Sequence, residues 1–340
     1  MTRQPRTRPT LEEVAAIAGV GRGTASRVIN GSSKVSDKAR QAVEGAIAEL
    51  GYVPNRAART LVTQRTDAVA LVIAESEERV FGEPFFAGVV RGVGTALSDA
   101  RLQLVLLLAH AAHRQERLDD YLTRQHVDGV LLLSLHDDDT LPDRIRERGL
   151  PVVLGGRAAD HQKGAYVDAD NVLGARLAVD HLVHRGRTRI GAILGPLDMV
   201  VGRTRHEGYL AGLAAAGLEA DDGLVASGDF SQDSGESAMR VLLSRRPDLD
   251  AVFCANDLMA AGALRVLREA GRAVPRDVSV VGFDDAPLAQ STHPPLTTVH
   301  QSPEQMGREM VSLLLEAMAH PDESPEPRLL ETRLVVRESS

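Results

Sequence analysis

Five polar side chains near the N-terminus stand at a spacing that suits contact with DNA. They follow a Gly-Val-Gly break and are Arg22, Thr24, Ser26, Arg27 and Asn30. An arginine can donate two parallel hydrogen bonds to guanine in the major groove. Short hydroxyl side chains and backbone N–H groups can contact phosphates and fix the register. The pattern alone leaves open a plain helical hairpin that binds no nucleic acid.

Three short helices are predicted to position these side chains. Thr10, with Glu13 three residues later, forms a capping box that opens a helix over residues 11–18. After the glycine break, a second helix runs over about residues 22–30. Ser36 is the N-cap of a third helix, which ends just before Gly51. A capped helix, a glycine turn and a second short helix describe a helix-turn-helix.

Charge is divided unevenly along the chain. Residues 1–65 hold 11 Arg and Lys against 5 Asp and Glu, although the whole chain has a formal net charge of −8. A basic head on an acidic body is expected when only the head meets a polyanion. A merely solvated basic tail is disfavoured, because these basic residues lie within a patterned helical segment.

Beyond residue 65, apolar runs of strand length alternate with amphipathic helical stretches. Such alternation indicates a parallel sheet covered on both faces. Two sets of runs, joined near residues 168–171, predict two similar α/β lobes with a ligand cleft beyond the carboxyl ends of their strands. Residues 294–301 are expected to cross back between the lobes. The runs are 67–74, 102–109, 127–134 and 151–156, then 189–195, 224–230, 251–257 and 277–285.

The N-terminal segment resembles the DNA-binding head of the lactose-repressor family. The similarity runs through TLEEVAAIAGVGRGTASRVINGSSKVSDKAR and continues into QAVEGAIAELGYVPNRAARTL. It implies that Arg22 and Gly23 occupy the main base-reading positions, flanked by Thr24, Ser26 and Arg27. Because Gly23 has no side chain, reading would fall mainly on Arg22 and favour guanine. Gly21 stands where the family usually has Ser, a weaker N-cap by only a few tenths of a kcal/mol.

The resemblance also implies a hinge helix over residues 55–61 that folds when two copies meet in the minor groove. A helix this short is marginal alone in water. Leu61 would be the apolar wedge that kinks the duplex, rather than a linker residue packed on the body. Two hinge helices imply a homodimer on a palindromic operator. The implied DNA-binding residues are Thr10, Arg22, Gly23, Thr24, Ser26, Arg27, Asn30, Asn55, Arg56, Ala58 and Leu61.

The body resembles the family's sugar-sensing core, which is related to periplasmic sugar-binding proteins. Arg205 in RHEGY matches an effector-contacting arginine, and Asn256 in FCAND and Asp284 in GFDD match polar residues at strand ends. A guanidinium, an amide and a carboxylate suit sugar hydroxyls, which donate and accept hydrogen bonds. The resemblance places an aromatic that stacks on the ligand at Phe230, and cleft-wall residues at Phe85 and Phe86.

Plainer interpretations of the body residues remain open. Asp284 could simply end a strand, Arg205 could form a surface ion pair, and Phe85 could belong to the core. The pattern VGRGTASRVING with EPFF and GDFSQDSG is similar to actinobacterial cellobiose-utilisation repressors, which implies a β-glucoside disaccharide such as cellobiose as the effector.

The expected fold class is α/β, with a three-helix helix-turn-helix head and hinge helix followed by a two-lobed, periplasmic-binding-protein-like core of parallel sheets. The expected domains are a disordered tail (1–9), the DNA-binding head (10–54), the hinge and linker (55–65) and the effector-binding and dimerisation core (66–340). Within the core, the N-lobe would comprise about 66–169 and 300–326, and the C-lobe about 170–299 and 327–340.

Enzymatic, metal and cofactor sites are not expected. The nucleotide-binding patterns G-x-G-x-x-G (after the first body strand) and G-x-x-x-x-G-K-[ST] are missing, as is the G-x-S-x-G elbow. Cys254 lies within an apolar run and is expected to be a packed thiol. His181 and His184 lack a third ligand nearby, and Asp137-Asp138-Asp139 is expected to be a solvated loop.

The sequence therefore predicts a DNA-binding repressor that a small sugar releases from its operator. A single cysteine, no signal peptide and no membrane-length apolar run predict a cytoplasmic protein without a membrane partner. One alternative keeps the DNA-binding head but has a co-repressor, such as a purine or a phosphorylated partner protein. Others are a sugar-binding protein for transport, which the basic head disfavours, and an enzyme on the same scaffold.

Overall fold

Three helices pack into a small domain of their own at the N-terminus. They are α1 (Leu11–Ile17), α2 (Arg22–Ile29) and α3 (Asp37–Leu50), around a core that includes Val14, Val28 and Val43. The predicted capping box is confirmed, since the Thr10 hydroxyl accepts from Glu13 N and the Glu13 carboxylate accepts from Thr10 N. The Ser36 N-cap is confirmed as well, and Gly51 ends α3 at φ +62°.

This computed structural model describes residues 9–29, 32, 34–52, 65–109, 118, 120–157 and 164–340. The predicted DNA contacts Asn30, Asn55, Arg56, Ala58 and Leu61 lie outside the described residues. The chain divides into two compact units, Met1–Thr66 and Asp67–Ser340. Within the described part, no helix is both long and apolar enough to cross a membrane.

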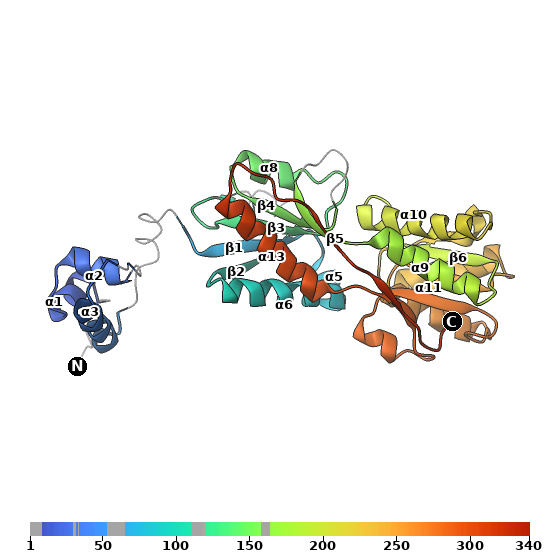
Figure 1. Cartoon of the computed structure of the whole chain (residues 1–340). Helices are drawn as coiled ribbons and strands as arrows, with labels where there is room; N and C mark the ends of the chain where they lie inside the picture. The colour runs from blue at the N-terminus through green and yellow to red at the C-terminus, as the bar shows by residue number, and fades with distance from the viewer. Residues whose placement is uncertain are drawn as a thin grey trace. The chain divides into compact units, whose positions relative to one another are not determined.

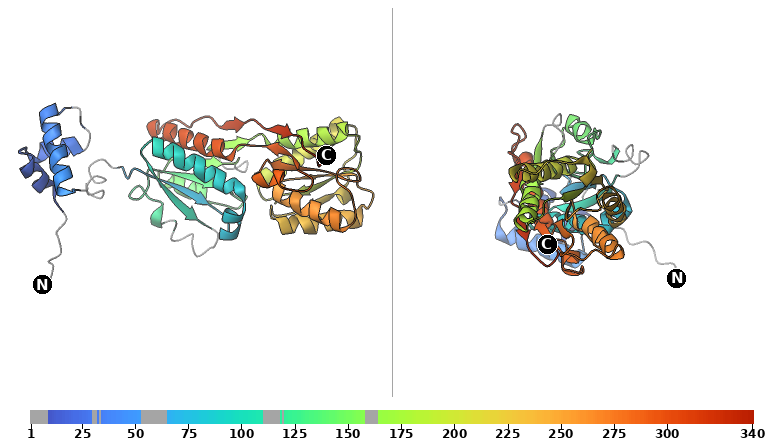
Figure 2. Two further views of the ribbon diagram at one scale, coloured as in Figure 1. Left: turned by 90° about the horizontal axis from the view of Figure 1, so that it is seen from below. Right: turned by 90° about the vertical axis from the view of Figure 1, so that its right-hand side faces the viewer.

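The second unit consists of two lobes, each with a six-stranded sheet between helices (Figures 1 and 2). The first sheet has the order β11-β5-β4-β3-β1-β2 and all of its strands are parallel. Helices α6 and α13 cover one face and α8 the other. Its elements are β1 (Ala68–Ile73), α5 (Glu77–Gly82), α6 (Pro84–Asp99), β2 (Gln103–Leu108), β3 (Gly129–Leu133), α8 (Leu141–Glu147), β4 (Val152–Gly155), β5 (Ala165–Ala169), α13 (Pro303–Ala319) and β11 (Arg328–Leu330).

The second sheet has the order β12-β10-β9-β8-β6-β7, and only β12 is antiparallel. Helices α9 and α10 cover one face, and α11 and α12 the other. Its elements are α9 (Asn171–His184), β6 (Ile190–Leu194), α10 (Val200–Ala215), η1 (Asp222–Leu224), β7 (Val225–Ser227), α11 (Gln232–Arg245), β8 (Ala251–Cys254), α12 (Asp257–Glu269), β9 (Ser279–Asp284), η2 (Pro287–Gln290), β10 (Thr297–His300) and β12 (Arg333–Val335).

Along the described residues, the chain crosses between the lobes three times. The first crossing follows β5, near the predicted junction at residues 168–171. Residues 294–301 were expected to form the second crossing, but most of them belong to β10. Thr297, Thr298 and Val299 of this strand are buried in the second sheet, so the chain crosses only after β10. The third lies between β11 and β12, a few residues later than expected, because β11 pairs with β5.

Candidate functional site

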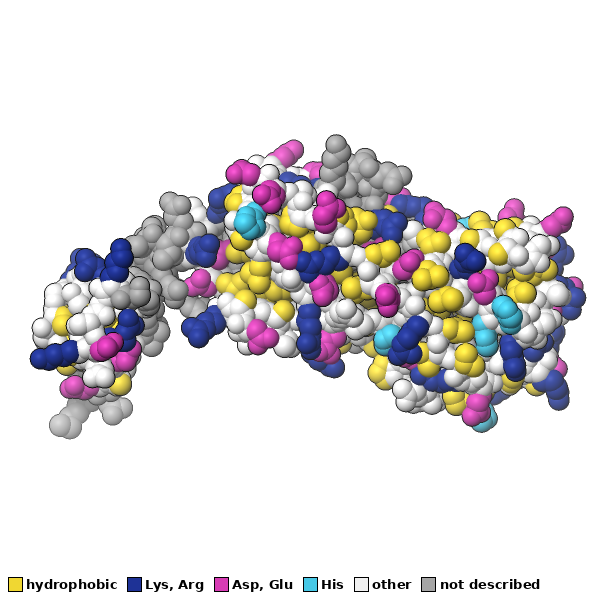
Figure 3. Space-filling view, viewed as in Figure 1, with side chains coloured by type: hydrophobic (Ala, Val, Ile, Leu, Met, Phe, Trp, Pro, Cys, Tyr) yellow, Lys and Arg dark blue, Asp and Glu magenta, His cyan; other side chains and the backbone are white. Residues whose placement is uncertain are grey.

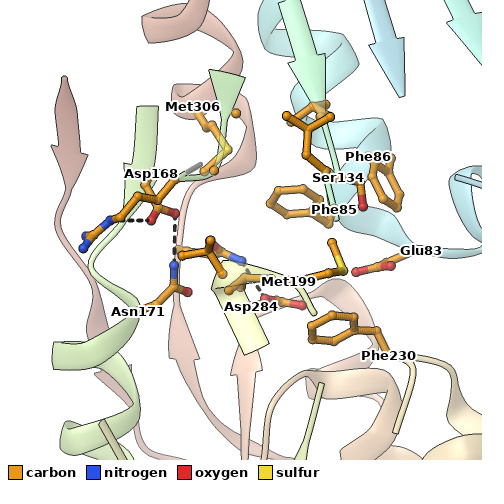
Figure 4. Close-up of a pocket in the computed structure, with 18 of the residues that line it drawn as sticks. Glu83, Phe85, Phe86, Ser134, Asp168, Asn171, Met199, Phe230, Asp284 and Met306 are labelled. Carbon is orange, nitrogen blue, oxygen red and sulfur yellow. Dashed lines mark hydrogen bonds and ion pairs between the residues drawn. The ribbon is translucent and has the colours of Figure 1, made fainter. Parts of the chain in front are cut away.

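A cavity of about 750 Å³, open mouth included, lies between the two lobes of the second unit (Figure 4). Both lobes contribute residues that follow the carboxyl ends of parallel strands, where ligands bind in α/β folds. The lining is Arg79, Glu83, Phe85, Phe86, Leu133, Ser134, Leu135, Gly155, Gly156, Arg157, Asp168, Asn171, Met199, Val200, Val201, Arg205, Phe230, Asp284, Gln301 and Met306.

Arg205, on α10, is a fixed cation in the cavity wall. It is 3% exposed, which rules out a surface ion pair. Its Nε donates to Asn171 Oδ1 at 2.9 Å, Nη1 donates to the carbonyl of Ala255, and Nη2 lies 3.5 Å from Asp284 Oδ1. The guanidinium carbon lies 3.6 Å from the centre of the Phe283 ring. Burial lowers the pKa of Arg205, and the nearby carboxylates oppose that shift.

Three buried carboxyl groups face the same cavity. Desolvation raises the pKa of Asp284 to about 6 against the attraction of Arg205, and raises the pKa of Asp168 to about 6 against Arg157. It raises the pKa of Glu83 to about 7, against Arg79. Carboxyl groups that titrate near neutral pH can either accept or donate hydrogen bonds, which suits a ligand rich in hydroxyls.

Aromatic rings give the cavity its apolar walls. Phe85 and Phe86 come from α6 in the first lobe, with ring centres 5.5 Å apart in an edge-to-face arrangement. Phe230 faces them from the second lobe (Figure 4). The Arg79 guanidinium carbon lies 5.1 Å from the centre of Phe230 and 6.0 Å from that of Phe86, so this side chain links the two walls.

Three non-glycine residues of the lining have left-handed backbone conformations. The φ angles are +61° at Ser134, +70° at Phe230 and +109° at Asp284. Such conformations are costly for residues with a Cβ and concentrate at functional sites. Ser134 directly follows β3, Asp284 ends β9, and Phe230 lies in the segment between β7 and α11.

The structure brings five of the six predicted ligand residues to this cavity: Phe85, Phe86, Arg205, Phe230 and Asp284. The sixth, Asn256, does not line it. Its Nδ2 donates to the Phe230 carbonyl at 2.8 Å and its Oδ1 accepts from Met259 N at 2.9 Å. Asn256 is therefore the N-cap of α12 and supports the loop that carries Phe230.

Sequence reasoning missed several polar residues of the lining. Asn171 holds Arg205 on one side and donates to Asp168 Oδ1 at 3.0 Å on the other. Gln301 Nε2 donates to Asp284 Oδ1 at 2.6 Å from the segment after β10. Arg79 lies within the short helix α5 and Glu83 is its C-cap, and the apolar pattern does not mark this helix.

The N-terminal unit presents basic side chains on its surface (Figure 3). In α2, Ala25 and Val28 face the core, which leaves Arg22, Gly23 and Arg27 exposed and Thr24 and Ser26 half-buried. Arg22 Nε pairs with Glu12 Oε1 of α1 at 2.9 Å. Thr10 is also exposed, but its hydroxyl serves the capping box.

Comparison with known proteins is decisive for the family. The model described as bacterial regulatory proteins, lacI family, matches residues 10–55, and the periplasmic binding protein-like domain matches residues 179–340. HTH-type transcriptional regulator CelR of Thermobifida fusca is 56% identical over 98% of this chain and 99% of its own length. The chain belongs to the lacI family. The ribose operon repressor of Escherichia coli (strain K12) is 37% identical over 92% of this chain and 94% of the relative.

Solved structures agree with this family membership. A CelR–cellobiose complex has a TM-score of 0.79 and 54% identity, covering 98% of this chain and 100% of that one. A lac repressor dimer bound to operator and an anti-inducer has a TM-score of 0.86 and 29% identity, with 98% and 99% covered. This lacI-family chain is thus a DNA-binding transcriptional regulator and not an enzyme, which confirms the predicted family, fold class and type of function.

Proposed function

We propose that this regulator binds a palindromic operator as a homodimer and is released when cellobiose, or a closely related β-glucoside disaccharide, occupies the cleft. The observation that carries the proposal is the cavity wall in which Arg205, Asn171 and Asp284 form one buried polar cluster opposite aromatic rings. Sugars combine hydroxyl rims with apolar faces, and this wall offers partners for both. The complex of the related CelR with cellobiose supports this choice of sugar.

Release follows from the linkage between the cleft and the DNA-binding segments. A ligand shifts the equilibrium between lobe arrangements only by its difference in affinity for them.

We assign the DNA contacts to residues 10–54, the hinge to 55–65 and the sensing core to 66–340. Because such a regulator acts on the chromosome, we place it in the cytoplasm.

The test is an operator-binding titration with the full-length protein. A palindromic duplex selected by the protein from a random library is titrated in the presence of cellobiose, ribose or buffer alone. We expect cellobiose to weaken operator binding and ribose to leave it unchanged. Tighter binding with cellobiose would identify a co-repressor, and no effect of cellobiose at saturating concentration would reject it as the effector.

Apolar surface on the first lobe supports the homodimer. The outermost strand β2 is mostly apolar but only partly buried, with Leu106 38% exposed, and Phe81 on α5 is 76% exposed. Exposed apolar surface at a sheet edge is a feature of protein–protein contacts.

A further inference from the structure

Two loops from opposite lobes meet beside the cavity through charged side chains. Asp137 follows β3 in the first lobe, and Arg203 lies in the first turns of α10 in the second. Arg203 Nη1 and Nη2 donate to the two carboxylate oxygens of Asp137 at 2.6 and 2.9 Å. Next to them, His136 Nδ1 lies 2.7 Å from Asp198 Oδ2, and Asp137 N donates to the Asp198 carbonyl at 2.9 Å.

None of these four residues lines the cavity, but their chain neighbours do. Ser134 and Leu135 precede His136 in the lining, and residues 199–201 lie between Asp198 and Arg203. Each loop is also held to its own lobe. Arg203 Nη1 donates to the Leu197 carbonyl at 2.7 Å, and the Ser134 hydroxyl donates to buried Glu75 at 2.6 Å.

We propose that Asp137 and Arg203 are positioning residues that latch the two lobes in the arrangement that holds the effector. This inference rests on the proposed function and adds to it a determinant of ligand affinity outside the ligand's own contacts. A ligand that touches Phe85 in one lobe and Arg205 in the other requires both lobes in register. The apparent dissociation constant rises as the fraction of molecules in that arrangement falls.

The geometry of the pair sets the expected size of the effect. The side chains of Arg203 and Asp137 are 35% and 43% exposed, so solvent screens their attraction. The pair is bidentate and adjoins the His136–Asp198 contact. We therefore expect it to hold the lobes together more strongly than an isolated surface ion pair would. We expect a roughly three- to tenfold loss of effector affinity when the latch is broken.

The experiment is calorimetric titration of full-length protein with cellobiose. Asp137→Asn, Arg203→Gln and the double variant should each bind roughly three- to tenfold more weakly, with the double variant no weaker than the worse single variant. The charge-reversed pair Asp137→Arg with Arg203→Asp should bind more tightly than either of its single reversals. Asp180→Asn breaks the Arg176–Asp180 pair within α9 and is the matched control, with binding expected to match the parent.

The latch proposal is overturned if both single variants bind cellobiose with the affinity of the parent. It is also overturned if the losses of affinity in the single variants add in the double variant and the charge-reversed pair restores no binding. If the parent itself does not bind cellobiose, the proposed effector is wrong, and thermal unfolding of the same variants then tests the latch. Non-additive losses of Tm would support an inter-lobe pair, and additive losses would reject it.

Discussion

Arg205 and Asp284 form a buried ion pair in the cavity wall, with Arg205 Nη2 3.5 Å from Asp284 Oδ1. The two side chains come from α10 and from the end of β9, and are only 4% and 11% exposed. Gln301, at the crossing between lobes, donates to the same carboxylate oxygen. A ligand that contacts this pair therefore acts on a cluster that includes the crossing segment.

Removing the cation alone should be strongly destabilising. Arg205→Met leaves Asp284 buried without its counter-charge, and we expect a loss of about 3–5 kcal/mol in the free energy of unfolding. Asp284→Asn combined with Arg205→Met should recover part of that loss, because no uncompensated charge remains. Urea unfolding of the parent, of the single variants Arg205→Met and Asp284→Asn, and of the double variant measures the loss and its recovery. A double variant as unstable as the sum of the singles would contradict the pairing.

Glu83 should make stability depend on pH. Burial raises its pKa from 4.5 to about 7, so the folded state holds a proton that the unfolded state has lost between these pH values. Stability from this group is present below pH 4.5 and is lost as pH rises through 7. Glu83→Gln should therefore raise the free energy of unfolding by about 1–3 kcal/mol at pH 8.

The Glu83→Gln gain should shrink steadily as the pH falls and vanish near pH 4.5. Denaturant unfolding of parent and variant at several pH values between 4.5 and 8 provides the measurement. A gain of equal size at every pH would show that packing, and not ionisation of Glu83, causes it.

The elements were largely predictable from the sequence, because long apolar runs and capping residues are local signals. β5 was missed because AYVDA is short and a charged Asp interrupts its apolar pattern, and β11 because its partner lies far away in sequence. Asp284 ends one buried strand and Asn256 comes just after another, but only Asp284 faces the cavity, whereas Asn256 caps a helix. Sequence alone cannot separate these two uses of a polar residue at a strand end.

Phe230 should contribute to sugar affinity through its ring. Phe230→Leu keeps an apolar side chain but removes the aromatic face, and we expect cellobiose binding to weaken about tenfold. The readout is calorimetric titration alongside the Tm of the protein without sugar. An unchanged dissociation constant with unchanged Tm would show that the ring does not contact the ligand.

The exposed strand β2 should be needed for self-association. Leu106→Glu places a charge on this outermost strand, where the parent exposes apolar surface. We expect the variant to sediment as a monomer in analytical ultracentrifugation at concentrations where the parent is a dimer, and to bind a palindromic operator much more weakly. Arg91→Gln, on the exposed surface of α6, lowers the net charge by the same single unit and serves as a charge-matched comparison. If the Leu106→Glu protein is still a dimer, the dimer interface does not include this part of β2.

Arg22 should carry most of the base discrimination by the N-terminal domain. Its Nε is paired with Glu12, and end-on recognition of guanine uses the terminal Nη1 and Nη2 atoms. Arg22→Ala should cost roughly 1–3 kcal/mol of operator binding and relax discrimination at one base pair in each half-site. Arg27→Ala should instead weaken all sequences nearly equally, as expected for a phosphate contact. Binding to a panel of single-base operator variants at fixed salt distinguishes the two, and an Arg22→Ala protein with the parent's preferences would refute the assignment.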